Sequence, residues 1–416
     1  MRNVTKRVGK NGVSYRIKIS NGYDINGKQI VRSMTYNPDS GMTNKQIEKE
    51  VERQAILFED KVRRGFAIDE NMRFAEYAER FMAIKEIAPK TRERYKELLI
   101  RINQAIGHIR LGKIQPMHLQ AFYADLKNII SKKTKQPLAD RTINHYHRLI
   151  SAILSHACRA QVISRNVARR EYMEAPKFQE EEPNYLDDVE AKHIAELLLD
   201  EPDIRKKTAI ILLIYTGYRR GELCGLEWSD VDFKNHIIHT RRNSQYIRKV
   251  GIITKAPKNK SSIRPMKLPP VVFTLLEEYR QWQRIERVKN GDRWNPEIDI
   301  IMPDGKGFKT VRVKNDRLFT TAVGKPLFPD TINFWIEKFR EKNQLTEFTP
   351  HTLRHTNVTL QIAAGVSVRT IAARAGHSKT STTTNIYSHA IKSADEAASQ
   401  AIDSILTSAP SEEKNG

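Results

Sequence analysis

Residues 216–223 have the sequence Thr-Gly-Tyr-Arg-Arg-Gly-Glu-Leu, and the interpretation of the C-terminal half of the chain starts from them. They follow the apolar run 209–215, which is expected to be the end of a helix. Glycine commonly ends helices, so this helix should stop at Gly217, and a short second helix should begin within a few residues. Arg219 then lies at a junction between two helices, where its guanidinium can point into a cleft.

Two further stretches of this half combine basic residues with expected element ends. Residues 255–262, Lys-Ala-Pro-Lys-Asn-Lys-Ser-Ser, are expected to form the turn between two strands. Residues 349–355, Thr-Pro-His-Thr-Leu-Arg-His, are expected to begin a helix, because threonine is a good N-cap and Pro350 suits the first helical position. His351 and Arg354 are three residues apart, so both emerge on one face of the first turn of that helix.

The last stretch combines Gly376-His377 with the segment 384–389, Thr-Asn-Ile-Tyr-Ser-His, which contains Tyr387. Taken singly, each candidate has an ordinary structural explanation. An arginine such as Arg219 commonly forms a structural ion pair. A lysine in a turn is commonly just exposed, and a tyrosine after a threonine-rich run is commonly a half-buried packing residue. The argument for a functional site therefore rests on the order and combination of the four stretches.

His351 and His355 have the i, i+4 spacing of a helical pair of metal ligands. The glutamate of the zinc-binding pattern His-Glu-x-x-His is absent between them, and no nearby cysteine or carboxylate completes a tetrahedral site. A glycine-rich phosphate-binding loop of the Walker type is also absent. The sequence therefore predicts no metal site and no cofactor.

The composition indicates a nucleic-acid partner. The 416 residues include 71 Lys and Arg against 49 Asp and Glu, so the formal net charge is +22. An excess of this size is typical of proteins that bind a polyanion. The longest apolar run is too short to span a bilayer, no apolar stretch follows the charged N-terminus, and the 2 cysteines are too few for a disulfide framework. These features predict a cytoplasmic protein with no membrane partner.

Residues 1–66 are expected to form a small sheet followed by one helix. Asn-Gly pairs, which favour hairpin turns, flank the alternating segment 13–19, and a second strand is expected at about 29–36. The helix should start at Thr43, with Gln46 as its capping partner.

Arg16 and Lys18 lie on the polar face of the first of these strands. An ordinary solvated face would explain both residues. A ribbon of two or three strands also fits the major groove of DNA, where a basic face would contact phosphates and bases. Arg16 and Lys18 are therefore candidate DNA-contacting residues.

Residues 70–170 are predicted to be all-helical, with helices at 91–106, 116–128 and 140–160. Basic residues recur along these helices. Their excess over acidic residues favours a face turned towards DNA over a merely solvated surface. Three of them are singled out as DNA-contact candidates: Lys90, Arg92 and Arg141.

Three segments complete the chain. Repeated glutamates and a proline predict a linker at 171–185. Residues 186–392 mix helices with a short sheet. In residues 393–416, apolar side chains at helical spacing predict an amphipathic helix followed by a disordered end. That helix is expected to dock either on its own domain or on a neighbouring protomer.

Together the four stretches resemble the motifs of the tyrosine recombinases, the phage integrase family. TGYRRGELCGLEW resembles the first arginine box, PKNKSS the β-hairpin lysine motif, HTLRH the second box, and AGH with NIYSH the third. The resemblance covers the whole chain, because integrases of this family also begin with an arm-binding sheet and a helical core-binding domain. By motif position it assigns these catalytic residues: Arg219, Lys258, His351, Arg354, His377 and the nucleophile Tyr387.

The lysine assignment leaves an alternative. Lys260 lies two residues from Lys258 in the same expected turn. Lys258 is preferred because it follows Pro257, as the motif lysine of the family follows a proline. Three residues adjoin the boxes and are expected to support the site rather than to catalyse: Arg220, Glu222 and His355.

The resemblance implies an α+β multidomain fold, with a small N-terminal β-sheet plus helix that binds arm-type DNA, an all-α core-binding domain, and a mainly α catalytic domain with a short β-sheet. It implies integration and excision of a phage or conjugative transposon through a 3′-phosphotyrosyl intermediate. The implied partners are double-stranded DNA, further copies of the chain in a tetramer on DNA, an excision factor and a host DNA-bending protein. The alternatives are a catalytically silent DNA-binding regulator and a type IB topoisomerase-like enzyme.

The residue types also suit this chemistry in their own right. Arg219 and Arg354 can donate paired hydrogen bonds to the non-bridging oxygens of a phosphodiester while remaining charged. His351 and His377 can hold or move protons near neutral pH. A tyrosine, whose pKa is about 10, needs a base or a cationic surround to become a nucleophile. A lysine can protonate the departing 5′ oxygen.

Overall fold

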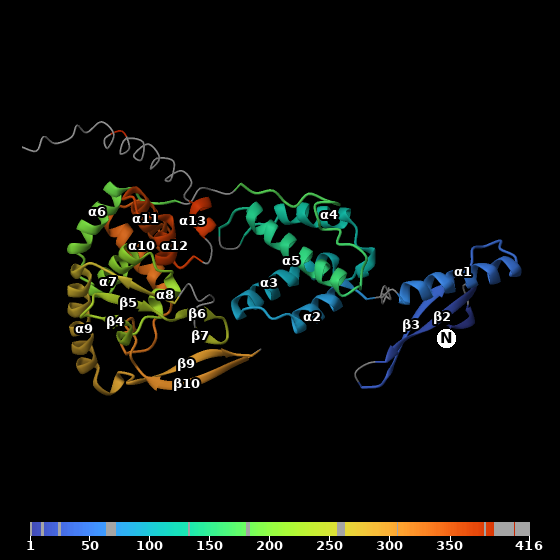
Figure 1. Ribbon diagram of the computed structural model, residues 1–416, viewed down its shortest axis with the longest axis horizontal. Coiled ribbons are helices and arrows are strands. Elements are labelled where there is room, and N and C mark those ends of the chain that lie inside the picture. The colour runs from blue at the N-terminus through green and yellow to red at the C-terminus, as the bar shows by residue number, and fades with distance from the viewer. Residues whose placement is uncertain are drawn as a thin grey trace, which may run out of the picture. The chain divides into compact units, whose positions relative to one another are not determined.

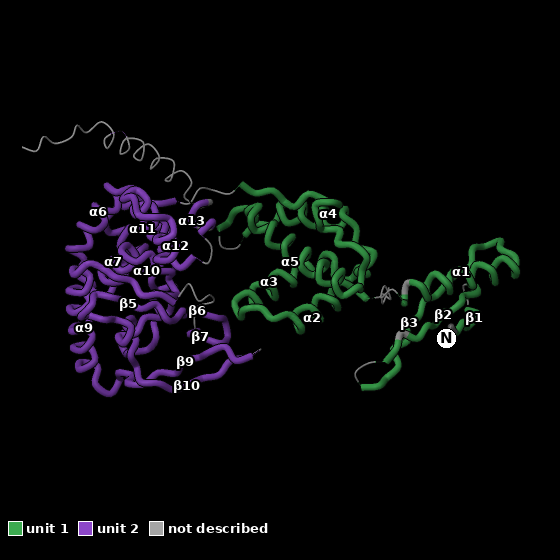
Figure 2. Tube along the Cα trace, in the orientation of Figure 1, with its two compact units in different colours: residues 1–180 green, residues 181–416 purple. Residues whose placement is uncertain are grey.

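The computed structural model describes residues 2–9, 12–23, 26–63, 72–131, 134–179, 184–255, 263–305, 307–377, 380–386 and 403. The chain forms two compact units, residues 1–180 and 181–416 (Figure 2). The division falls inside the segment 171–185, for which the sequence predicts a linker. Each unit is described separately below.

Unit 1 begins with a three-stranded antiparallel sheet covered by one helix (Figure 1). Its elements are β1 (Arg2–Gly9), β2 (Gly12–Tyr23), β3 (Gln29–Tyr36) and α1 (Asn44–Arg63). Ile17 and Ile19 of β2 are buried with the side chains of α1, whereas Lys18 is exposed, which confirms the predicted alternation. The predicted cap is also present, because the Thr43 backbone N–H donates to Gln46 Oε1 at 2.8 Å.

A four-helix part with its own core follows in unit 1. Its elements are α2 (Phe74–Ile84), α3 (Pro89–Ile106), η1 (Leu111–Lys113), α4 (Pro116–Lys127) and α5 (Asp140–Arg159). Three of these helices confirm the sequence prediction, and α2 is additional. In α5, Ala139 has the extended backbone of the N-cap, and Asp140 is the first residue of the helix.

Unit 2 contains most of the helices and two small sheets. Its helices are α6 (Asp188–Leu199), α7 (Ile204–Thr216), α8 (Arg220–Cys224), η2 (Trp228–Asp230), α9 (Pro270–Asn290), η4 (Gly291–Arg293), α10 (Asp330–Asn343), α11 (Pro350–Ala363), α12 (Val368–Ala375) and α13 (Thr380–Ile386). Its strands are β4 (Val231–Asp232), β5 (Ile237–Thr240), β6 (Asn243–Ile247), β7 (Gly251–Lys255), β8 (Arg264–Lys267), β9 (Glu297–Asp304) and β10 (Gly307–Lys314).

The strands of unit 2 form one sheet of order β10-β9-β7-β6 and another of order β4-β5-β8. The α+β fold is therefore as expected, with two short sheets where one was predicted. Helix α7 lies at the centre of unit 2, since it packs against α6, α8, α9, α10 and α11. Its residues Ala209, Leu212 and Leu213 are completely buried. The end of this anchored helix positions the first candidate arginine.

No helix within the described ranges is both long enough and apolar enough to cross a bilayer.

Candidate active site

Arg219 lies in the junction between α7 and α8, where the sequence predicts it. Helix α7 ends at Gly217, which has the left-handed conformation (φ 60°). A Cβ atom at this position would also lie 2.8 Å from Asn357 Oδ1 of α11, so glycine is required both by the turn and by the close packing. Arg219 then precedes the first turn of α8, with 36% of its side chain exposed.

The carboxylate of Glu222 holds Arg219 in place. Arg219 Nη1 donates to Glu222 Oε1 at 2.9 Å, and the Arg219 backbone N–H donates to Oε2 at 3.1 Å. A second arginine, Arg264 of β8, donates from Nη2 to the same Oε2 at 3.2 Å. Burial raises the pKa of Glu222, but Arg264 and Arg219 outweigh it and leave that pKa below its ordinary value. Glu222 is therefore an ionised carboxylate that is only 2% exposed.

Arg354 joins the end of α7 to the end of α12. Helix α11 begins as predicted, with the Thr349 side chain accepting from the Thr352 N–H and Pro350 in the first turn. From that turn Arg354 donates to Gly217 O at 2.7 Å and to Ala375 O at 2.5 Å, and it is 4% exposed. Segments that lie far apart in the sequence are thus brought together by one guanidinium.

His377 follows the end of α12, where Gly376 takes the left-handed conformation (φ 68°). Its Nδ1 lies 2.8 Å from the hydroxyl of Thr383 in α13, a contact that fixes the orientation of the ring. Burial, together with the nearby charges of Arg354 and Arg219, lowers the pKa of His377 to about 4. The imidazole is therefore neutral at pH 7.

His351 shares this environment. Burial lowers its pKa, and the charges of Arg354 and Arg219 contribute to the same shift. Four of the six predicted catalytic residues therefore lie close enough to influence one another: Arg219, His351, Arg354 and His377.

The other two predicted catalytic residues, Lys258 and Tyr387, lie outside the described residues, as does the alternative Lys260. Helix α13 ends at Ile386, immediately before Tyr387 in the sequence. The strands on either side of residues 256–262 are present, but they differ from the expected hairpin. β7 belongs to the four-stranded sheet and β8 to the three-stranded one, so the two strands do not pair with each other.

The residues expected to support the site have three different roles. Glu222 holds Arg219, as described above. Arg220 forms an ion pair with Asp330 of α10. Burial and the neighbouring His351 lower the pKa of His355 to about 4, so it is a neutral histidine beneath the site. Among the described residues, no group of three or more His, Cys, Asp or Glu side chains could hold a metal ion.

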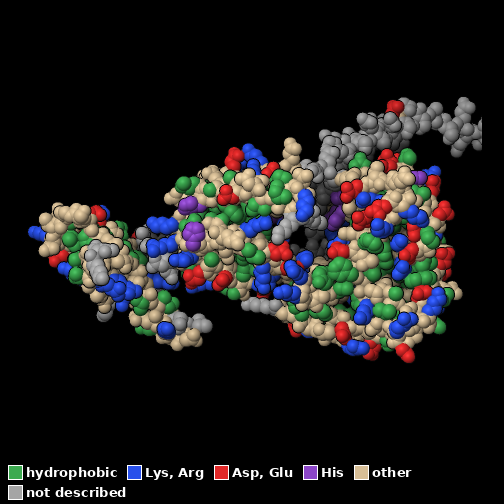
Figure 3. Space-filling model, turned by 180° about the vertical axis from the view of Figure 1, so that it is seen from behind, with side chains coloured by type: hydrophobic (Ala, Val, Ile, Leu, Met, Phe, Trp, Pro, Cys, Tyr) green, Lys and Arg blue, Asp and Glu red, His purple; other side chains and the backbone are tan. Residues whose placement is uncertain are grey.

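The candidate DNA-contacting residues of unit 1 lie on its surface or at helix ends. Arg16 Nη2 donates to Ser33 Oγ at 3.3 Å, and Lys18 is exposed on the same strand. Lys90 pairs with Glu93, and Arg141 is exposed in the first turn of α5. Figure 3 shows groups of Lys and Arg side chains on this part of the chain, with some acidic side chains among them.

Arg92 has a different environment from the other four candidates. Its guanidinium donates to the carbonyls of Met82 and Lys85, the latter at 3.0 Å, and so caps the C-terminal end of α2. These two hydrogen bonds are sufficient to explain the position of the Arg92 guanidinium. Contact of any of the five residues with DNA stays a prediction.

Two protein-family profiles match this chain. The profile of the Phage integrase family matches residues 184–393, half of the chain. The chain belongs to the phage integrase family. A second profile, that of the Phage integrase SAM-like domain, matches residues 73–173. As a member of this family the chain is a tyrosine recombinase, a DNA breaking and rejoining enzyme.

Two relatives extend the similarity over almost the full length. The "Tyrosine recombinase XerC-like" protein of Caldanaerobacter subterraneus subsp. tengcongensis is 26% identical over 402 residues, which cover 92% of this chain and 94% of that protein. The "ICEBs1 integrase" of Bacillus subtilis is 23% identical and covers 94% of this chain and 97% of its own.

Solved structures share the fold. The Tn1549 transposon integrase in complex with transposon right end DNA is 21% identical, with a TM-score of 0.63 over 81% of this chain and 100% of that one. A lambda integrase dimer bound to a COC' core site is 16% identical, with a TM-score of 0.51 over 92% of this chain and 93% of that one. The recognised family and the expected fold are thereby confirmed.

Three residues of this recombinase's site were missed by sequence reasoning. Arg264 binds Glu222, Thr383 contacts His377, and Asn357 donates from Nδ2 to Ile214 O at 2.8 Å beneath Gly217. All three residues lie within two positions of a recognised stretch, so their position in the sequence was a usable signal. The partners of Arg264 lie far away in the sequence, and only the folded structure reveals them.

Proposed function

We propose that this chain integrates and excises a mobile element by site-specific recombination, with Tyr387 as the nucleophile. The observation that carries the proposal is the convergence of two arginines and two neutral histidines from three separate motifs. Helix α13, which contacts His377 through Thr383, ends one residue before Tyr387. A short connection of this kind supports delivery of the phenol to the cationic cluster.

In the proposed cleavage step, Tyr387 Oη attacks the scissile phosphorus and forms a 3′-phosphotyrosyl bond. The bond from phosphorus to the 5′ oxygen breaks, and Lys258 supplies the proton that the departing oxygen takes up. Arg219 and Arg354 stabilise the charge that develops on the non-bridging oxygens. Because the new bond is still a phosphodiester, the 5′ hydroxyl of another strand can attack it and release the tyrosine. Strands are exchanged with no net hydrolysis and no cofactor.

The low pKa values of the histidines suit this role. A neutral His351 or His377 can donate one hydrogen bond to the phosphate and accept another. A bound phosphate adds negative charge beside the cluster, which raises the pKa of both rings towards their ordinary value. Either ring is then able to take up the phenolic proton of Tyr387.

Each domain predicted from the sequence has its own function in this proposal. Residues 1–66 bind arm-type sites and residues 70–170 bind core-type sites, both on double-stranded DNA. Residues 171–185 link them to the catalytic domain, residues 186–392. An excision factor and a host DNA-bending protein assist on the DNA, and the enzyme works in the cytoplasm of a bacterial host. The groups of basic side chains on unit 1 support this assignment.

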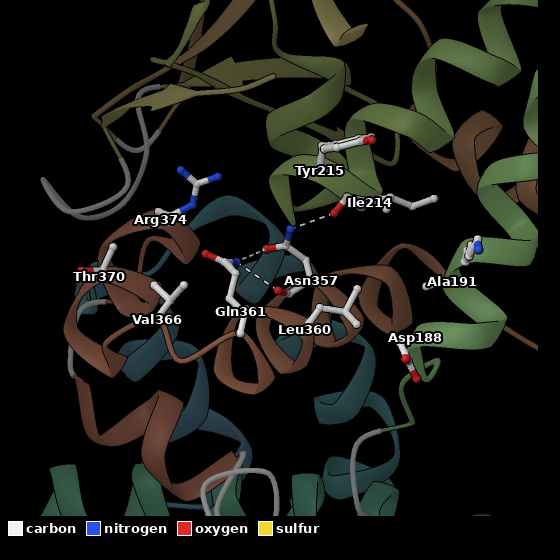
Figure 4. A pocket seen from close by; sticks show the side chains of 12 residues that line it. Asp188, Ala191, Ile214, Tyr215, Asn357, Leu360, Gln361, Val366, Thr370 and Arg374 are labelled. Carbon is white, nitrogen blue, oxygen red and sulfur yellow. Dashed lines mark hydrogen bonds between the residues drawn. The ribbon is translucent and has the colours of Figure 1, made fainter. Parts of the chain in front are cut away.

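Assembly into a tetramer on DNA would use residues 393–416, which lie almost wholly outside the described residues. Unit 2 has a pocket of about 690 Å³ between α6, α7, α11 and α12 (Figure 4). Ile214, Leu360 and Val366 give it an apolar lining. We propose that the apolar stripe of the C-terminal helix from a neighbouring protomer docks there.

Deletion of residues 393–416 tests the assembly. The truncated chain should bind a single core site as the full chain does, but pair two DNA molecules poorly in a synapsis assay. Equal losses in both assays would contradict docking between protomers.

Covalent trapping tests the activity itself. DNA from the junction of the mobile element, nicked near the scissile phosphate, is mixed with the wild type and with Tyr387→Phe, and both are denatured in detergent. A DNA-linked protein band with the wild type alone is expected. DNA binding without a band would favour the binding regulator. Relaxation of supercoiled DNA without joining of two duplexes would favour the topoisomerase-like alternative. A band that persists in Tyr387→Phe would exclude Tyr387 as the nucleophile.

A further inference from the structure

Arg264 is a buried arginine that contacts the site and lies two residues after the stretch 255–262. It is the first residue of β8, and its side chain is 7% exposed. Nη2 donates to Glu222 Oε2 at 3.2 Å, and Nε donates to Arg374 O in the last turn of α12. The guanidinium also lies over the ring of Tyr218, with Cζ 5.6 Å from the ring centroid. One side chain thus links β8, α8 and α12.

The end of α12 shows what this link does. Three successive carbonyls accept from three different arginines: Arg374 O from Arg264, Ala375 O from Arg354, and Gly376 O from Arg219. Cations are favourable at a helix C-terminus because the free carbonyls there carry partial negative charge. His377 is the next residue in the chain. The position of this histidine therefore depends on a set of three arginines, two of which are assigned to the phosphate.

Gly376 fits closely against Arg264. A Cβ atom added at Gly376 would lie 2.7 Å from Arg264 Nη1 and 3.0 Å from its Cζ. The guanidinium is therefore packed directly on the turn that presents His377. The same guanidinium holds Glu222, which in turn holds Arg219.

We propose that Arg264 is a positioning residue for recombination, which fixes Arg219 through Glu222 and fixes His377 through the end of α12. The proposal rests on the function proposed above. Arg264 acts through these neighbours and not by contact with DNA. Its loss should slow strand cleavage and leave DNA affinity unchanged.

The pH dependence of cleavage separates positioning from simple structural support. Glu222 faces Arg264 and Arg219, and without Arg264 its burial raises its pKa. His377 faces Arg354, Arg219, Arg264 and His355, and its pKa also rises when one of these cations is removed. Protonation of either group disturbs the site, so the acidic limb of the rate profile should move to higher pH.

The test uses the full chain and nicked core-site DNA with Arg264→Gln, Arg264→Lys and the control Arg242→Gln. Arg242 is a comparable arginine, 22% exposed, bound to the buried carboxylate of Asp230. Core-site affinity, melting temperature, and the single-turnover rate of covalent complex formation from pH 5.5 to 8.5 are measured for each protein.

Arg264→Gln should keep its DNA affinity within about twofold and lose on the order of 100-fold in rate, as small displacements of catalytic groups do. The acidic limb of its pH–rate profile should move to higher pH. Arg264→Lys, which retains the charge but not the forked geometry, should recover part of the rate and return the limb towards that of the wild type. Arg242→Gln should retain the wild-type rate and profile per folded molecule.

A rate and pH profile of Arg264→Gln equal to those of Arg242→Gln would overturn the proposal. So would a loss of rate that merely follows lost DNA binding or folding in both Arg264 variants. An absence of covalent complex with the wild type would instead overturn the proposed function itself.

Discussion

Two buried carboxylates in unit 2, Glu222 and Asp230, are each bound by two arginines. Glu222 is 2% exposed and Asp230 is 1% exposed. Arg219 and Arg264 bind Glu222, and Arg241 and Arg242 bind Asp230. The two clusters are therefore alike in composition and in the burial of the carboxylate.

The clusters differ in what else their arginines contact. Arg219 and Arg264 extend to the carbonyls at the end of α12, beside His377. Arg242 instead pairs with a second carboxylate, Glu227, at 2.6 Å. A buried ion pair alone is weak evidence for either stability or function. The remaining hydrogen bonds of its arginines indicate that the Glu222 cluster serves the site and the Asp230 cluster serves the fold.

The largest expected effect comes from removing each carboxylate in turn. Glu222→Gln should lower the rate of covalent complex formation on the order of 100-fold, because Arg219 loses its anchor. Asp230→Asn should leave the rate within about threefold per folded molecule. Each change should destabilise the protein by about 2 kcal/mol, because the neutral amide loses the charge-assisted hydrogen bonds of a buried carboxylate. Rates normalised to folded protein check the comparison, and equal rates for the two variants would remove the distinction between the clusters.

Two glycines at helix ends provide a second comparison. Gly376 (φ 68°) and Gly365 (φ 75°) are both left-handed, so alanine should cost each about 1 kcal/mol of backbone strain. A Cβ at Gly376 would meet Arg264, whereas nothing lies within 4 Å of a Cβ at Gly365. Gly376→Ala should therefore slow cleavage by about tenfold, and Gly365→Ala should not. Similar rates in the same assay would show that the packing against Arg264 is unimportant.

The contact between Thr383 and His377 should have a smaller effect. Thr383 is completely buried, and its hydroxyl lies 2.8 Å from His377 Nδ1. Thr383→Val keeps the shape and removes the hydroxyl, so cleavage should slow by about fivefold as the ring loses its orientation. Thr383→Ser keeps the hydroxyl and should restore most of the rate. Failure of serine to do so would assign the effect to packing.

The smallest expected effect concerns the pH dependence of the protein's stability. The folded-state pKa of His377 is lowered from 6.5 to about 4, so the unfolded chain binds the proton more readily. The contribution of this group to the free energy of unfolding is therefore fully present above pH 6.5 and is lost as the pH falls towards 4. His377→Gln should therefore reduce the drop in melting temperature between pH 7 and pH 5 by about 3 °C. An unchanged drop would indicate that this histidine does not titrate as described.

Local signals account for what the sequence predicts correctly. Gly217 ends a helix and Thr349 with Pro350 starts one, and both signals act within a few residues. Alternation placed Ile17 and Ile19 on the buried face of β2. By contrast β1 was missed because its apolar residues Val4 and Val8 are exposed and show no alternation.

Tertiary contacts account for what the sequence could not predict. Arg264 and Glu222 are 42 residues apart, and Arg264 and the Arg374 carbonyl are 110 residues apart. No local pattern reports such pairs. For the same reason, the sequence between β7 and β8 could not predict that the two strands belong to different sheets. The motifs predicted which residues form the site, and the structure shows what holds Arg219, Arg354 and His377.

The covalent attachment site is the most direct test of the whole account. The DNA adduct of the wild-type enzyme is digested with trypsin and nuclease, and the peptides are sequenced by mass spectrometry. Trypsin releases residues 380–392, in which Tyr387 is the only tyrosine. The account predicts a nucleotide attached to Tyr387 through its 3′ phosphate. Attachment to a different residue, or through a 5′ phosphate, would contradict it.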